Sequence, residues 1–300
     1  MGESRSIIAG VLNCSYYEAG PSDGPAVFLL HGFPYAPQVY ESVAAQLAKA
    51  GCRVITPYLR GYGPTQFLSE ETLRSGEQAA LGADLLALMD ALEIERAILS
   101  GYDWGGRAAC VVSALWPQRV IGLVSGGGYN VQNIATSDTP SHPEAELRHW
   151  YQYYFHSERG RRGLIENRHE IGQLLWQLWS PKWTFDDEVY NRCAKAFDNK
   201  DYVEVVLHSY RHRYALVDGD PAYTDIEKQL AAQPVIDVPT LGLFGDANGV
   251  AGPCSEHLDR AKFSQSYDAR VLADVGHNIP LEAPEVFAGA ALELLQRNHG

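Results

Sequence analysis

The sequence has few features of a membrane-spanning, secreted or nucleic-acid-binding protein. No stretch approaches the roughly 20 apolar residues of a membrane span, and the first residues lack the basic and then apolar layout of a signal peptide. The five cysteines are far apart and show no metal-binding spacing, which favours reduced thiols and no metal site. The formal net charge of -13 disfavours nucleic acid and anionic membranes as partners, because both need clustered Lys and Arg. We therefore expect a cytoplasmic protein.

The composition instead suits a globular protein with a large buried core. The chain has 300 residues, of which 46% are apolar, 11% aromatic and 20% charged, an ordinary balance for a packed interior. This length is long for one core and short for two independent cores. We expect one large domain that carries an inserted subdomain.

Short apolar runs alternate with helical patterns along much of the chain. Runs of this kind are typical of parallel strands that are buried on both faces. The expected strands are 26–30, 52–57, 97–100, 120–124, 239–244 and 269–272, and the expected helices are 40–50, 78–92, 105–115 and 285–295. The alternation predicts an α/β fold, with a mostly parallel sheet and helices on both faces.

The alternation breaks between about residues 131 and 233. Aromatic-rich helical stretches such as 149–155 and 174–179 replace the strand signals there. We interpret residues 131–233 as an inserted helical cap, called the lid below. Residues 1–130 and 234–300 would form the core domain.

The turn after the third expected strand carries the first chemical signal. Segment 101–106 reads GYDWGG, the layout of a nucleophile elbow, G-x-S-x-G, with Asp103 in the place of serine. Small residues flank the central one because such a turn is strained and passes close to its neighbours. We predict that Asp103 is a nucleophile. A helix-capping aspartate in a tight turn would give the same local pattern.

Two further segments stand where an elbow of this kind needs them. Segment 31–34, HGFP, follows the first of these strands, so the backbone N–H groups of Phe33 and Trp104 are the expected oxyanion hole. Segment 276–278, GHN, follows the last strand, which makes His277 the expected general base.

Together these motifs resemble the epoxide hydrolase and haloalkane dehalogenase branch of the α/β-hydrolase superfamily, over nearly the whole chain. A carboxylate can displace at a saturated carbon and leave an alkyl ester on the enzyme. The resemblance implies that Asp103 forms this ester and that water activated by His277 hydrolyses it, without cofactor or metal. The substrate would be a small molecule, and the aromatic lid favours an apolar one.

Within this branch the resemblance favours an epoxide hydrolase, which converts an epoxide to a vicinal diol. Epoxide hydrolases use two lid tyrosines to protonate the epoxide oxygen. Segment 150–155, WYQYYF, is similar to the family's Tyr-Gln-x-Tyr-Phe stretch, and segment 209–211, SYR, resembles its Trp-Tyr-Arg stretch. The implied acids are Tyr151 and Tyr210, with Gln152 as a substrate-binding neighbour. Packing is the alternative role of any single tyrosine.

Haloalkane or haloacid dehalogenases, which use the same ester mechanism, are the alternative. Trp104 fits the halide-binding tryptophan that follows their nucleophile, but Phe33 stands where some of them have asparagine. Arg107 matches one of the arginines that hold the substrate carboxylate in haloacid-type members, and Trp104 occupies the position of another. We assign His31, Trp104 and Arg107 to substrate binding.

The residue that should orient His277 departs from the family pattern. The family's acid stands three residues beyond the glycine that ends the next-to-last strand, and this residue is Asn248, whereas Asp246 stands one beyond it. The other place used in the family offers Asn130. An asparagine can fix the imidazole tautomer but cannot stabilise an imidazolium, so slow ester hydrolysis is expected unless Asp246 reaches His277. A non-catalytic small-molecule binder with a decayed triad is the third interpretation.

Overall fold

The protein is described by a computed structural model, which covers residues 2–252 and 259–298. In these residues a nine-stranded sheet has the order β1-β2-β4-β3-β6-β7-β8-β9, and β5 pairs with β2. The strands are β1 (Arg5–Ala9), β2 (Leu12–Ala19), β3 (Ala26–Leu30), β4 (Arg53–Pro57), β5 (Gln66–Phe67), β6 (Ala97–Tyr102), β7 (Val120–Gly126), β8 (Thr240–Gly245) and β9 (Tyr267–Leu272). All neighbours from β4 to β9 are parallel, and the other pairs are antiparallel.

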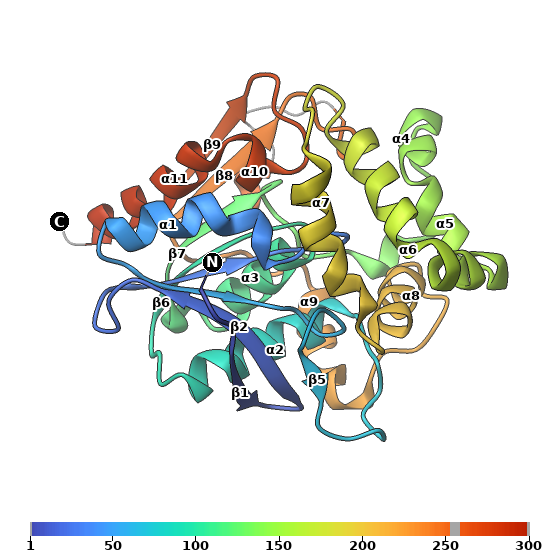
Figure 1. Cartoon of the computed structure of the whole chain (residues 1–300), viewed down its shortest axis with the longest axis horizontal. Helices are drawn as coiled ribbons and strands as arrows, with labels where there is room; N and C mark the ends of the chain where they lie inside the picture. Colours follow the sequence, from blue (N-terminus) through green and yellow to red (C-terminus); the bar gives the residue numbers. More distant parts are fainter. Residues whose placement is uncertain (1, 253–258, 299–300) are drawn as a thin grey trace.

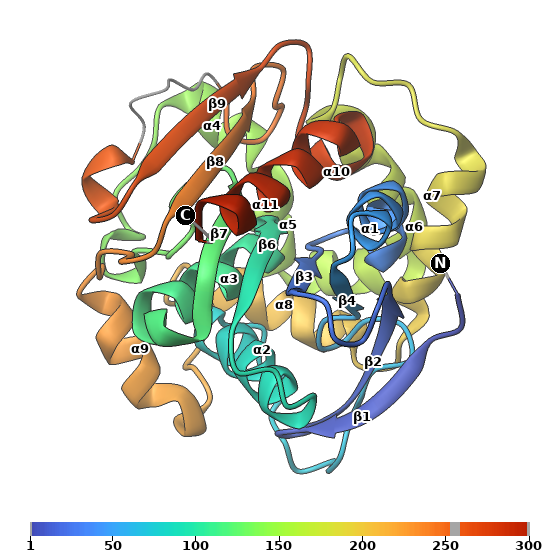
Figure 2. The same ribbon diagram turned by 90° about the vertical axis from the view of Figure 1, so that its left-hand side faces the viewer.

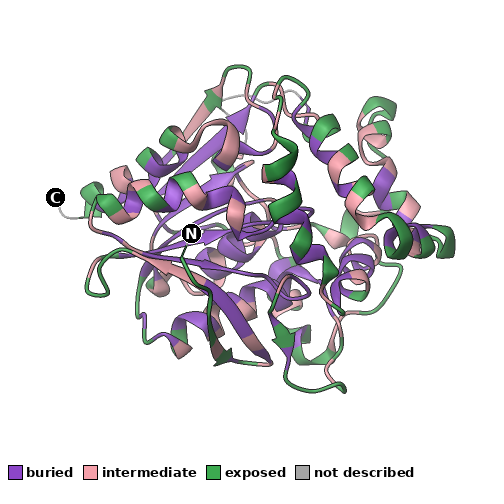
Figure 3. Cartoon of the chain, in the orientation of Figure 1, coloured by how far each residue is buried: buried purple, intermediate pink, exposed green. Residues whose placement is uncertain are grey.

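The central strands are buried along their whole length, which is the reason for their continuous apolar runs. Every residue of β3 and β6 is buried, and Figure 3 shows the sheet as the buried centre of the molecule. The register pairs Leu30 at the end of β3 with Gly101 in β6. The turns that follow these two strands, with the HGFP segment and with Asp103, therefore lie side by side.

Helices cover both faces of the sheet (Figures 1 and 2). On one face α1 (Glu41–Lys49) packs against α11 (Pro284–Asn298), and on the other α2 (Gln78–Ala91) packs against α3 (Asp103–Leu115). The short helix α10 (Ile279–Glu282) precedes α11. The predicted α/β class, the parallel sheet and the helices on both faces are confirmed.

The remaining helices lie between β7 and β8 in the sequence, inside the segment predicted to form the lid. They are α4 (Pro143–Arg148), α5 (Trp150–His156), α6 (Glu158–Trp179), α7 (Asp187–Ala194), α8 (Tyr202–His212) and α9 (Thr224–Ala231). Helices α4 to α8 gather on the right of the sheet in Figure 1. The segment 31–34, HGFP, is called the oxyanion loop below. A buried hydrogen bond of 2.8 Å from Nε1 of Trp176 in α6 to the carbonyl of Pro34 connects this layer to the oxyanion loop.

The antiparallel strands β1 and β2 were absent from the sequence prediction. Strand β2 reads LNCSYYEA, in which polar residues interrupt the apolar ones. It has neither the continuous run of a buried strand nor a strict alternation, so its pairing with β4 is set by tertiary contacts.

Candidate active site

Asp103 occupies a strained turn between β6 and α3. Its backbone φ is +51°, a left-handed conformation that aspartate tolerates better than most residues. A Cβ atom at Gly105 would lie 2.0 Å from the carbonyl oxygen of Leu30, and one at Gly32 would lie 2.3 Å from Oδ1 of Asp103. Close approach thus requires glycine in both turns, which accounts for the elbow pattern in the sequence.

The Asp103 carboxylate accepts two main-chain hydrogen bonds through one oxygen. The nitrogens of Phe33 and Trp104 lie 2.9 and 2.7 Å from Oδ1, which leaves Oδ2 on the side of His277. Burial raises the pKa of Asp103, but the hydrogen bond with His277, the charge of Arg107 and the Phe33 N–H outweigh it and hold the pKa at about 2. Asp103 is therefore ionised at neutral pH, in a fixed orientation.

His277 lies between Asp103 and Asn248. Its Nε2 is 3.5 Å from Oδ2 of Asp103, and its Nδ1 is 3.3 Å from Nδ2 of Asn248. The Oδ1 of Asn248 accepts hydrogen bonds from the N–H groups of Val250 and Ala251, which assigns the atom facing His277 as the amide NH2. An NH2 group only donates. Nδ1 of His277 is therefore an acceptor, and the proton of the neutral imidazole is on Nε2.

This tautomer is the opposite of the one that a general base needs. A catalytic histidine accepts a proton at the nitrogen that faces the reacting centre, while an acid holds a proton on the far nitrogen. In this site the nitrogen that faces Asp103 already carries the proton. Asn248 thus favours the form of His277 that carries its proton on the nitrogen facing Asp103 and disfavours the form that activates water.

The two other candidates for the orienting position contact different groups. Asp246 is exposed, and its Oδ1 accepts a hydrogen bond of 2.7 Å from the N–H of Asp274. The Nδ2 of Asn130 donates to the hydroxyl of Ser125 and to nearby carbonyls. The structure brings the positional match, Asn248, to His277 and turns Asp246 toward the loop after β9.

The C-terminal end of lid helix α6 holds the loop that carries His277. Oγ of Ser180 accepts hydrogen bonds from the N–H groups of His277 and Asn278, at 3.1 and 3.3 Å, and donates to Oε1 of Glu282 at 2.6 Å. The carbonyl of Trp179 also accepts from the N–H of His277. The sequence analysis missed Ser180 and Glu282, because contacts between the lid and the core leave no local pattern.

Tyr151 of α5 and Tyr210 of α8 lie over the same ring, that of Phe33. Their ring centroids are 6.3 and 5.3 Å from that of Phe33 and 5.4 Å from each other. Burial raises the pKa of Tyr151 to about 12 and the pKa of Tyr210 well above its usual value, so both hydroxyls stay protonated at neutral pH. The structure brings the two predicted acids together above the oxyanion loop.

Gln152 connects Tyr151 to a cation that the sequence analysis did not single out. Nε2 of Gln152 donates to the Tyr151 hydroxyl at 2.9 Å, and its Oε1 accepts from Nη1 of Arg213 at 3.2 Å. The Tyr151 oxygen is the acceptor in this contact, which leaves its proton available to a ligand. Arg213 stands three residues after Tyr210, and this helical spacing is the signal that could have found it.

The ring of His31 connects the oxyanion loop to the main chain after β4. The residue is fully buried. Its Nε2 accepts from the N–H of Leu59 at 3.1 Å, so its Nδ1 carries the proton and donates to the carbonyl of Gly32 at 3.1 Å. The main chain uses both ring nitrogens, and this geometry does not support the predicted role of His31 in substrate binding.

The buried His31 should make folding stability depend on pH. Burial lowers its pKa from 6.5 to about 4. Between these two pH values the histidine of the unfolded chain binds a proton, whereas His31 of the folded chain does not. Stability is then lost as the pH falls from about 6.5 to about 4, by roughly 3 kcal/mol in total. Urea unfolding of the wild type and His31→Gln, at about pH 7 and about pH 4.5, checks this. We expect a smaller loss in the variant, and an equal loss in both would contradict the assignment.

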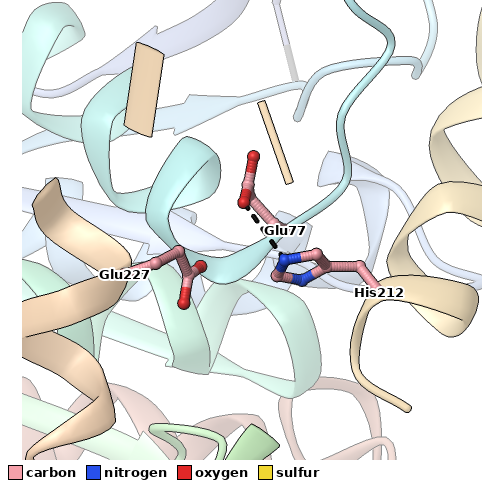
Figure 4. Close-up of side chains that lie close together, drawn as sticks. All are labelled: Glu77, His212 and Glu227. Atoms are coloured by element: carbon pink, nitrogen blue, oxygen red, sulfur yellow. Dashed lines mark ion pairs between the residues drawn. The ribbon is translucent and has the colours of Figure 1, made fainter. Parts of the chain in front are cut away.

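A second buried group of charges joins the lid to the core. Glu77, His212 and Glu227 have potential ligand atoms within 4.8 Å of one another, and Figure 4 shows them facing each other from three elements. Oε1 of Glu77 already accepts from the N–H of Asp220, and Oε1 of Glu227 accepts from the N–H of Ala79 at the start of α2. Oε2 of Glu77 lies 3.4 Å from Nε2 of His212 in α8. These contacts account for both carboxylates as links of α8 and α9 to the core.

The chain belongs to the alpha/beta hydrolase fold family, whose family model matches residues 25–284. A crystal structure from Klebsiella pneumoniae, assigned as an epoxide hydrolase, is 45% identical, covers 98% of this chain and 97% of its own, and superposes with a TM-score of 0.96. Epoxide hydrolase 4 of Mus musculus is 29% identical over 93% of this chain and 75% of its own length. An epoxide hydrolase of Caballeronia sordidicola is 36% identical, over 32% of this chain and 29% of its own.

These similarities confirm the predicted family and the resemblance to its epoxide hydrolase branch. The chain is a hydrolase of the epoxide hydrolase type, and the dehalogenase alternative is not favoured. None of the described helices has the length and apolarity that crossing a membrane requires.

Proposed function

We propose that this protein hydrolyses an epoxide to a vicinal diol through an alkyl ester on Asp103. The observation that carries the proposal is the unequal use of the two carboxylate oxygens. Oδ1 accepts hydrogen bonds from the N–H groups of Phe33 and Trp104, whereas Oδ2 has no main-chain donor among the described residues and faces His277. One oxygen is positioned as a future oxyanion and the other as a nucleophile.

In the first half-reaction, Oδ2 of Asp103 attacks a ring carbon of the epoxide, and the carbon–oxygen bond opens. The departing oxygen takes a proton from Tyr151 or Tyr210, which lie above the oxyanion loop. The donated Gln152 N–H stabilises the phenolate if Tyr151 is the acid. A hydroxyalkyl ester on Asp103 is the product of this step.

In the second half-reaction, water attacks the carbonyl carbon of the Asp103 ester. The charge that develops on Oδ1 is held by the Phe33 and Trp104 N–H groups. His277 must take the proton of this water, and for that its own proton must move from Nε2 to Nδ1. The NH2 group of Asn248 opposes this move, because two donors would then face each other. Ester hydrolysis is therefore the slow step. It ends when the ester carbon–oxygen bond breaks and the released diol oxygen takes the proton from His277. The Asp103 carboxyl then returns a proton to the tyrosine phenolate, which restores the enzyme.

Product analysis tests the reaction class. The protein is incubated with aryl and alkyl epoxides and with haloalkanes and haloacids, and diol and halide are assayed. Formation of diol from an epoxide is the expected result. Release of halide without any diol would move the enzyme to the dehalogenases, for which the buried Nε1 of Trp104, without an acceptor among the described residues, would be a halide donor. No product from any compound would favour the non-catalytic binder.

The two lid tyrosines should matter for ester formation and not for folding. We expect Tyr151→Phe and Tyr210→Phe each to slow ester formation by about 10²-fold, because the ring oxygen leaves without its acid. The rate is measured by stopping the reaction with acid at several times and determining the fraction of ester-bearing protein by intact-protein mass spectrometry. Tyr190→Phe is the matched control, because this lid tyrosine is buried in α7 and its hydroxyl donates to the carbonyl of His169. Unchanged rates in both single variants would contradict the acid role.

We place the core at residues 1–130 and 234–300 and the lid at 131–233. The position of the six helices α4 to α9 between β7 and β8 supports the division. We also place the enzyme in the cytoplasm. In the part of the chain that the structure describes the cysteines are buried and form no disulfide, which supports a reducing compartment; they are Cys14, Cys52, Cys110 and Cys193.

A further inference from the structure

Two arginines lie beside the tyrosine pair. Arg107 stands four residues after Asp103 on α3, so it projects from the same side of the helix. Arg213 directly follows α8, which carries Tyr210. Arg213 packs on the ring of Tyr210, and the charges of both arginines act on the two lid tyrosines.

Arg213 has donors that the protein does not use. Its Nη1 donates to Gln152, and its guanidinium carbon lies 4.5 Å from the centroid of the Tyr210 ring. Its Nε and Nη2 are buried and have no acceptor among the described residues. Buried charged donors without acceptors are costly, so these two atoms point to a missing ligand.

Arg107 is also without a counterion. The residue is partly buried, and in the described part of the chain no carboxylate lies within 4.0 Å of either guanidinium. Burial and then the charge of Arg213 lower the pKa of Arg107 to about 10. The nearby charge of Asp103 offsets one of the two cations.

An open cleft on the surface reaches Arg213, whereas Arg107 is not among its lining residues. It has a volume of about 470 Å³, and Arg213, His149, Tyr153 and Tyr214 are among its lining residues. The acidic Glu146 at this cleft is engaged by the N–H of Ser141 and the hydroxyl of Tyr153. The volume of this cleft is sufficient for a small organic acid.

We propose that the substrate carries a carboxylate next to its epoxide ring, and that Arg213 binds this group. The inference rests on the proposed function, since it names the substrate class of the same site. The guanidinium fork of Arg213, with its two unpaired donors, matches the two oxygens of a carboxylate. The aromatic walls formed by Phe33, Trp104 and Tyr210 would take the carbon skeleton. This revises the sequence-based expectation of an apolar substrate to an amphipathic one.

A matched pair of compounds tests the proposal. An aryl glycidate and its primary amide have the same shape and differ by one charge. We expect the wild type to prefer the glycidate in kcat/KM by at least about 10-fold, and Arg213→Gln to lose this preference through a KM raised about 10- to 100-fold. Arg213→Lys keeps the charge and should retain part of the preference. Arg161→Gln removes an equal charge from an exposed ion pair with Glu204 and should change nothing.

Equilibrium binding distinguishes failure of the carboxylate proposal from failure of the proposed function. Calorimetry with the dihydroxy acid that glycidate hydrolysis would yield needs no turnover. Binding to the wild type that is lost in Arg213→Gln, with a thermal melting curve that shows the variant folded, supports the anion site even if no epoxide is hydrolysed. In that case the proposed function alone fails. Hydrolysis of acid and amide at equal rates, or an unchanged preference in a folded Arg213→Gln variant, would overturn the carboxylate proposal and leave the function intact.

Discussion

Replacing Asn248 with aspartate should speed up ester hydrolysis by about 10²-fold or more. An aspartate in this place can accept the N–H groups of Val250 and Ala251 with one oxygen, as Asn248 does. Its other oxygen would then accept a hydrogen bond from Nδ1 of His277. The imidazole proton would move to Nδ1, and Nε2 would be free to take a proton from water. The carboxylate would also stabilise the imidazolium that forms.

The measurement is a comparison of ester lifetime and turnover. In the wild type, intact-protein mass after brief exposure to an epoxide should show a large fraction of Asp103 as the ester. In Asn248→Asp this fraction should fall while kcat rises. Asp246→Asn is the matched control, because this exposed carboxylate contacts the N–H of Asp274 and not His277. An Asn248→Asp variant no faster than the wild type would contradict the tautomer argument.

Replacing Asp103 with alanine should abolish both half-reactions, with a loss in kcat of at least about 10⁴-fold. The reason is covalent: without the carboxylate no ester forms, and the two N–H groups of Phe33 and Trp104 have no oxyanion to hold. His277→Gln should behave differently. It should still form the ester and fail only to hydrolyse it. Adduct in His277→Gln and none in Asp103→Ala is the expected pair of results.

An adduct of full size in Asp103→Ala would place the nucleophile elsewhere. Diol formation by this variant at an undiminished rate would show direct attack of water on the epoxide. Circular dichroism should accompany both variants, since Asp103 has a left-handed φ of +51° and a change there alters the turn that begins α3. A folded but inactive variant is required before the loss is assigned to chemistry.

The core of the site could be predicted because close backbone contacts require glycine at fixed positions of the sequence. Gly32 and Gly105 are required by contacts of 2.3 and 2.0 Å, and the register of β3 with β6 puts their two turns together. The positions of Asp103 and its N–H donors could be inferred from these glycines. His277 followed from its place after the last strand. These expectations needed no knowledge of side-chain packing.

The other features depend on side-chain packing, which local patterns do not encode. His31 stands beside the oxyanion loop in the sequence, yet its ring is directed at Leu59 and the main chain. Asn248 and Asp246 are two residues apart, and only the structure shows which faces His277. Arg213 reaches Gln152 through the packing of α8 against α5, a contact between lid helices that the sequence pattern does not specify.

A single turnover in water labelled with the heavy isotope of oxygen tests the ester on Asp103 most directly. With enzyme in excess over the epoxide, the oxygen that enters the first diol comes from the Asp103 carboxylate. The account predicts unlabelled diol and heavy oxygen in the peptide that contains Asp103. Labelled diol in the first turnover, with no label in that peptide, would show that water attacks the epoxide itself and would contradict the covalent mechanism.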